Sequence, residues 1–164
     1  ARSLEAVFVG LGGTRTRARV DRLLSSANGL AADLGNEHAL GLAAMAEGVT
    51  AWVQGRWKHA RRLCDEAAAT LRERCVGAIW ESDNAEMYAL GSLFMLGEIE
   101  ELSRRLPRLL ARTEERGNLL AARYLRRFDA HVFACLDNEA HLSVHAVEIV
   151  LTVCDQQEHD LRSV

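Results

Sequence analysis

The chain has 164 residues, enough for one domain, or one stretch of a repeat array, with a sizeable core. Its 49% hydrophobic content excludes a disordered protein, and a single proline with 12 glycines argues against turn-rich β architectures. The net charge of −3 excludes the basic excess with which nucleic-acid-binding proteins neutralise phosphates. Because its 25 alanines and 24 leucines are strong helix formers, the composition predicts an all-α protein.

Apolar residues at helical spacing predict eight helices. In chain order they span 2–11, 15–34, 37–54, 56–75, 79–96, 98–116, 118–136 and 139–159. The third carries four small residues at three- and four-residue spacing: Gly41, Ala44, Gly48 and Ala51. Such a run predicts a close backbone approach to a neighbouring helix. In the sixth, Pro107 removes one backbone hydrogen bond, so a kink or a break is expected near Ser103–Pro107.

Turns between these helices recur with a period of about 40 residues. One series is Gly12, Gly55, Gly97 and Asp137-Asn138, and the other is Gly35, Gly77 and Gly117. Two turns in each period indicate helical hairpins, and apolar positions such as Cys64, Leu106 and Ala146 keep the same register. The pattern predicts an α/α superhelical solenoid of about four hairpins with a 40–42 residue period. The units are about 1–34, 37–75, 79–116 and 118–159.

Five residues fall at the spacing of the tetratricopeptide repeat: Gly48, Gly55, Trp57, Ala60 and Ala67. The chain resembles this family, in the form with a longer period than the usual 34 residues. The resemblance implies that the first helix of each hairpin (helix A) lines an inner groove, while the second (helix B) lies outside.

A narrower resemblance covers residues 32–127. The strings that carry it are Gly55-Arg56-Trp57, Glu73-Arg74-Cys75-Val76-Gly77, Trp80-Glu81 and Leu96-Gly97-Glu98. They look like the repeat region that follows the kinase domain in some large bacterial serine/threonine protein kinases, and like segments of ATPase-type transcriptional regulators. These residues contain no kinase signature. We therefore expect a non-catalytic piece of a larger signalling protein.

The resemblance places six candidate partner-binding residues on the helix A groove: Trp52, Asn84, Met87, Tyr124, Arg127 and His131. Aromatic and arginine side chains are common anchors at interfaces, and the mixture suits an extended peptide or a partner helix. The alternative is that Met45, Val49, Trp52 and Phe94 are simply packed core.

Other candidate sites are weaker. His141, His145 and Glu148 share one helical face at metal-ligand spacing, but a solvated face is the commoner origin of such a set. The stretch Gly10–Thr14 lacks the preceding strand of a dinucleotide site and the lysine of a phosphate loop, so a plain turn is expected. We therefore predict no metal and no cofactor.

Charged residues near the helix ends have a structural explanation. The acidic ones are Glu81, Asp83, Glu86, Glu98, Glu100 and Glu101, and the helix B set is Arg104, Arg105, Arg108 and Arg112 with Glu114 and Glu115. We expect the acidic groups to complement helix dipoles in first turns, and the second set to form a solvated face. The four cysteines (Cys64, Cys75, Cys135 and Cys154) are expected to be small core residues in a reducing cytoplasm.

The sequence thus favours a cytoplasmic protein–protein interaction module rather than an enzyme. The partner is a protein or peptide, with no nucleic acid and no membrane, since no apolar stretch is long enough to span a bilayer. Two alternatives stay open. The array self-associates through exposed end hairpins, or it senses a small ligand.

Overall fold

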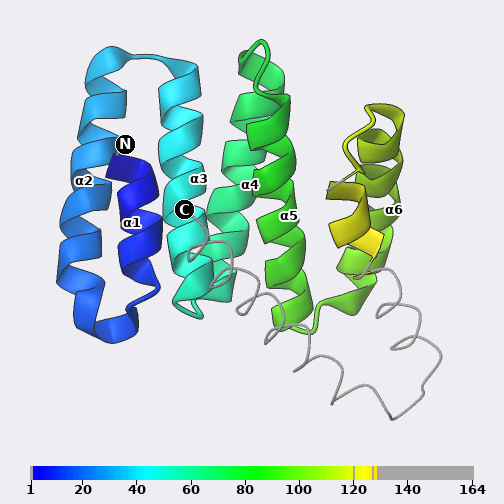
Figure 1. Ribbon diagram of the computed structural model, residues 1–164, viewed down its shortest axis with the longest axis horizontal. Coiled ribbons are helices and arrows are strands. Elements are labelled where there is room, and N and C mark those ends of the chain that lie inside the picture. The colour runs from blue at the N-terminus through cyan, green and yellow to red at the C-terminus, as the bar shows by residue number, and fades with distance from the viewer. Residues whose placement is uncertain (1, 120, 127, 129–164) are drawn as a thin grey trace.

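A computed structural model of the chain describes residues 2–119, 121–126 and 128 (Figure 1). The elements are α1 (Arg2–Gly10), the 3-10 helix η1 (Gly13–Thr16), α2 (Arg17–Leu34), α3 (Glu37–Val53), α4 (Trp57–Arg74), α5 (Ile79–Met95) and α6 (Ile99–Glu115). Residues 119, 121–126 and 128 are also helical. The described part of the chain contains no β-strand, so the predicted all-α class is confirmed there. The predicted helix at 139–159 lies outside the described residues.

Consecutive helices run in alternate directions and pack on their neighbours. Figure 1 shows the α2–α3 and α4–α5 turns at the top edge and the α3–α4 and α5–α6 turns at the bottom. Alternate helices are also in contact, α1 with α3 and α3 with α5. We call α1, α3 and α5 the helix A row.

Glycines in the left-handed conformation end these helices. The residues with positive φ are Gly13, Gly35, Gly55, Gly77, Gly97 and Gly117. This confirms the predicted turns that fall within the described residues, with one correction: the first series begins at Gly13, with φ of 65°, rather than at Gly12. The step to Gly55 is then 42 residues, the same as from Gly55 to Gly97. The shift arises because η1 inserts a short tight helix before α2. The predicted turn at Asp137-Asn138 lies outside the described residues.

Three core clusters lie between the described helices. A small one of Ala6, Val20 and Leu24 joins α1 to α2, and the two larger ones differ in composition. The alanine cluster joins α4 to α5 and comprises Ala67, Ala68, Leu71, Ala78 and Ala85. The leucine cluster joins α5 to α6 and the following helical residues, and comprises Leu90, Leu93, Leu102, Leu106, Leu109, Leu125 and Phe128. Because leucine is much larger than alanine, we expect the leucine cluster to hold α6 farther from α5 than the alanine cluster holds α4.

The small residues of α3 bring it close to α4, as predicted. A Cβ atom added at Gly48 would lie 2.5 Å from the Sγ of Cys64 and 3.2 Å from its backbone nitrogen. At Gly41 it would lie 2.7 Å from two carbons of the Leu71 side chain. These distances are shorter than van der Waals contact, so neither Gly48 nor Gly41 has room for a side chain.

Helix α6 continues through Pro107 from Ile99 to Glu115, so of the two predicted outcomes, a kink or a break, the break is wrong. Pro107 is exposed, and the carbonyl group that loses its hydrogen bond can therefore be solvated.

We expect Gly48→Ala to lower the free energy of unfolding by about 1–2 kcal/mol, because the cost of overpacking exceeds the gain in helix propensity. Gly29→Ala is the matched control. Gly29 lies inside α2 with no atom within 4 Å of an added Cβ, so this change should raise stability by up to about 1 kcal/mol. Urea denaturation of the two variants measures both effects. Equal shifts in the same direction would contradict the close approach of α3 and α4.

Candidate functional site

Four of the six predicted binding residues lie within the described part of the chain, and all four are half-buried. They are Trp52 on α3, Asn84 and Met87 on α5, and Tyr124 in the helical residues that follow α6. Arg127 and His131 lie outside the described residues. Half-burial is the state of a side chain that packs on one side and faces open space on the other.

The contact between α3 and α5 brings Trp52 onto α5. Its ring meets Tyr88 edge-on, with ring centroids 5.6 Å apart and planes at 71°. Its Nε1 lies 3.2 Å from the position that a Cβ atom of Gly91 would take, so this glycine makes room for the indole. Trp52 therefore packs directly on α5, against Tyr88 and Gly91.

Several predicted groove residues also take part in packing. Met87 and Tyr124 lie against the leucine cluster, and Tyr124 meets Phe128 edge-on at 5.4 Å. Val49 is buried at 6% exposure, so the alternative interpretation as core is correct for this residue. Asn84 differs, because its Nδ2 donates to the carbonyl oxygen of Trp80 at 2.8 Å and its side chain joins no apolar cluster.

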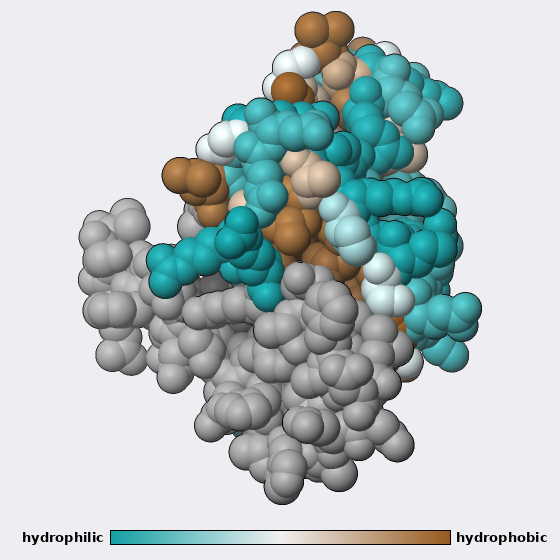
Figure 2. Space-filling view, turned by 90° about the vertical axis from the view of Figure 1, so that its right-hand side faces the viewer, coloured by the Kyte–Doolittle hydropathy of each residue, from teal (hydrophilic) through white to brown (hydrophobic). Residues whose placement is uncertain are grey.

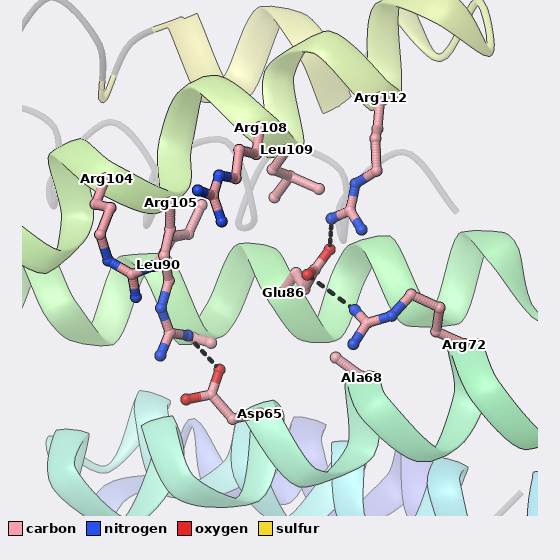
Figure 3. Close-up of a pocket in the computed structure, with 11 residues that line it drawn as sticks. Asp65, Ala68, Arg72, Glu86, Leu90, Arg104, Arg105, Arg108, Leu109 and Arg112 are labelled. Atoms are coloured by element: carbon pink, nitrogen blue, oxygen red, sulfur yellow. Dashed lines mark hydrogen bonds and ion pairs between the residues drawn. The ribbon is translucent and has the colours of Figure 1, made fainter.

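A second surface, which the sequence did not predict, opens between α4 and α6 (Figure 3). It is a cleft of about 750 Å³. Helix α4 contributes Asp65, Ala68 and Arg72, α5 contributes Glu86, Ala89 and Leu90, and α6 contributes Arg104, Arg105, Arg108, Leu109 and Arg112. The four α6 arginines were expected to form a plain solvated face. They instead form one wall of a cleft, and Arg105 and Arg112 are half-buried in it.

Ion pairs join the residues of α4, α5 and α6 that line this cleft. Arg105 donates from Nη1 to Asp65 Oδ1 at 2.7 Å. Glu86 accepts from Arg72 at 3.1 Å and also from Arg112. Five arginines face two carboxylates, which leaves the lining with three excess positive charges in a chain whose net charge is −3.

One arginine of the cleft stands apart. Figure 3 shows Arg108 reaching from α6 into the cleft without an interaction to the residues drawn. No hydrogen bond or ion pair joins Arg108 to any residue that the structure describes. Its five N–H donors are therefore available to an anionic group.

At the mouth of the cleft, Glu101 holds two of the arginines. Its carboxylate accepts hydrogen bonds from Arg104 at 2.9 and 2.6 Å and from Arg105. The hydrogen bonds from Arg104 and then Arg105 lower the pKa of Glu101 from 4.5 to about 2. The Glu101 carboxylate and the guanidinium groups of Arg104 and Arg105 are therefore ionised throughout the physiological pH range.

Asp83 and Glu86 correct the expectation that the acidic residues complement helix dipoles in first turns, because only Glu81 lies in the first turn of α5. Asp83 is buried at 3% exposure and pairs through Oδ1 with Arg116 at 3.2 Å. Glu86 lies farther along α5 in the cleft floor. Asp83 and Arg116 line a smaller hollow of about 90 Å³ that shares Arg72 and Arg112 with the main cleft. The carboxylates of Asp83 and Glu86 thus form ion pairs that join α5 to α4 and to the α6 end of the chain.

The remaining candidates give no further site. The Gly10–Thr14 stretch forms the turn between α1 and α2 and includes the start of η1. Among the residues described, no group of three or more His, Cys, Asp or Glu side chains is placed to hold a metal ion. His141, His145 and Glu148 lie beyond that part. None of the described helices combines the length and apolar character needed to cross a membrane.

Both described cysteines are free thiols. Cys64 is buried between α3 and α4, and this burial raises the pKa of its thiol to about 12. It is a core residue, as predicted, while Cys75 is half-buried beside the alanine cluster. Cys135 and Cys154 lie outside the described residues.

Comparison of the chain with protein-family models, with curated proteins and with solved structures finds no match. The resemblance to tetratricopeptide repeats therefore remains a prediction.

We expect the Glu101 carboxyl group to titrate near pH 2 in the folded protein, as followed by carbon-detected NMR. Because its folded pKa lies below the unfolded value, its contribution to stability is present above pH 4.5 and is lost as the pH falls towards 2. Arg104→Gln should move the midpoint upwards. Arg62→Gln, which removes a pair with Glu66 elsewhere on the surface, should leave it unchanged. A midpoint near 4.5 in the unmodified chain would contradict the assigned hydrogen bonds.

Proposed function

We propose that the chain is a helical-repeat module that binds a partner protein along its helix A row. The observation that carries the proposal is the contact of α1 with α3 and of α3 with α5, which aligns these helices side by side. Half-buried Trp52, Asn84, Met87 and Tyr124 lie along this row or beside it. An aromatic, a thioether and an amide side chain together offer apolar anchorage and hydrogen bonding to a peptide.

The proposed architecture is a tetratricopeptide-like solenoid. Turn glycines at steps of 40 to 42 residues, helices in alternate directions and contacts between successive A helices all support it. In such an array each hairpin covers the apolar face of the next, so that equivalent positions repeat along a surface. The fourth hairpin of the proposal, 118–159, extends beyond the described residues.

The proposed biological role is recognition rather than reaction, within a larger bacterial signalling protein. The resemblance of residues 32–127 to repeat regions of serine/threonine kinases and ATPase-type regulators supplies this setting. Arg127 and His131 belong to the proposed binding set by their register alone.

To test this function, a random-peptide display selection against the chain should enrich a related set of sequences. Asn84→Ala should weaken the synthetic consensus peptide by about fivefold through loss of one hydrogen bond, without a change in helicity by circular dichroism. Ser25→Ala, on the exposed side of α2, is the matched control and should bind normally. Failure to enrich any sequence family, or full affinity in Asn84→Ala, would count against the helix A row.

Self-association is the second candidate, and exposed apolar residues at the N-terminal hairpin favour it. Phe8, Leu11, Leu30 and Leu34 are 53%, 46%, 50% and 70% exposed. Sedimentation velocity at micromolar concentration should then reveal a dimer that Leu34→Gln weakens. A monomer at all concentrations tested would eliminate this candidate.

A further inference from the structure

We propose that the cleft between α4 and α6 is a second docking site, and that it binds an acidic peptide segment of a partner protein. Helical geometry turns the side chain by 100° per residue, which puts Glu86, Ala89 and Leu90 on a different side of α5 from Asn84 and Met87. The cleft is therefore separate from the proposed helix A surface, and the two can be tested independently.

Charge complementarity identifies the occupant as acidic. The lining has five arginines against Asp65 and Glu86, and when Glu101, which holds Arg104 and Arg105, is counted as well, two positive charges remain in excess, although the whole chain is negative. Arg108 offers a planar set of donors that no described residue uses, and planar donors of this kind match a carboxylate. Arg72 and Arg112 share Glu86, so each has further donors for an incoming carboxylate.

The shape and the floor of the cleft favour a peptide over a compact anion. The arginine wall extends along α6 from Arg104 to Arg112 and continues to Arg116 in the smaller hollow. Twelve residues of helix span about 18 Å, the length of about five residues of extended chain. Between the charges lie Leu90 and Leu109, with the small residues Ala68 and Ala89, so the cleft also offers apolar contact. A peptide with carboxylates on both sides of a leucine matches this order.

The same lining disfavours a nucleic acid. Asp65 and Glu86 project into the cleft and would repel a continuous row of phosphates. In Figure 2, which views the molecule from the α6 end, the described residues show hydrophilic side chains with hydrophobic patches between them. A short segment with separated charges suits this surface better than a uniform polyanion.

The test uses the full chain and a fluorescein-labelled ten-residue peptide with Glu and Asp on both sides of a central leucine. Fluorescence anisotropy at low salt should show saturable binding that weakens as salt is added. The counterpart with Gln and Asn in place of the acids should bind about tenfold more weakly. Replacing the central leucine by glycine should also weaken binding, because the apolar floor is then unused.

Two charge-matched variants locate the site. Arg108→Gln removes the unpaired arginine without breaking an ion pair and should weaken the acidic peptide about fivefold. Arg22→Gln, an equal loss of charge on the exposed face of α2, should leave binding unchanged. Circular dichroism confirms that both variants are folded.

Four results would overturn the proposal, of which the first three concern the peptide and the variants. These three are absence of saturable binding, equal loss in the Arg108 and Arg22 variants, and binding of a single-stranded DNA decamer as tight as that of the peptide. Competition by inorganic phosphate at concentrations equal to those of the peptide would likewise assign the cleft to a small anion. Asn84→Ala should bind the acidic peptide normally, so failure here and failure of the helix A proposal are distinguishable.

Discussion

The close approach of α3 to α4 sets the geometry of the rest of the structure. It exists because Gly48 and Gly41 have no side chains where Cys64 and Leu71 press against α3. Alanines then continue the tight packing from α4 into α5. With three helices held this closely, the positions of Trp52 and of the α5 residues that face it follow from backbone geometry rather than from any polar contact.

The looser packing of α6 has the opposite cause. Its buried face carries Leu102, Leu106 and Leu109. These leucine side chains fill the space between α5 and α6, which alanine side chains would leave partly empty. Helix α6 therefore stands off from α4, and long charged side chains bridge the gap, as in the pair between Arg105 and Asp65. Core composition thus explains why one side of α5 is closed by packing while the other holds a cleft.

Much of the fold was predictable from the sequence, because it depends on local signals. Helical periodicity and turn glycines located α1 to α6 within one or two residues, and small residues predicted the approach of α3 to α4. The cleft was not predicted, because its ion pairs join residues 14 to 40 positions apart on three different helices. Charges of opposite sign at Asp65 and Arg105, on successive B helices, were the one signal that pointed to it. Of the kink or break expected at Pro107, the break does not occur, because Pro107 is exposed and the helix tolerates it.

The energetics of the cleft favour exchange of ionic partners over permanent closure. Ion pairs between partly exposed side chains contribute at most about 1 kcal/mol each, because water screens them and both side chains lose freedom. An incoming carboxylate can therefore take donors from Glu86 or Asp65 at small cost, while Arg108 binds it without displacing anything. Affinity at such a site comes from several weak contacts acting together. Its selectivity comes from the apolar strip between the charges, because a ligand gains contact with Leu90 and Leu109 only when it places a hydrophobic side chain there.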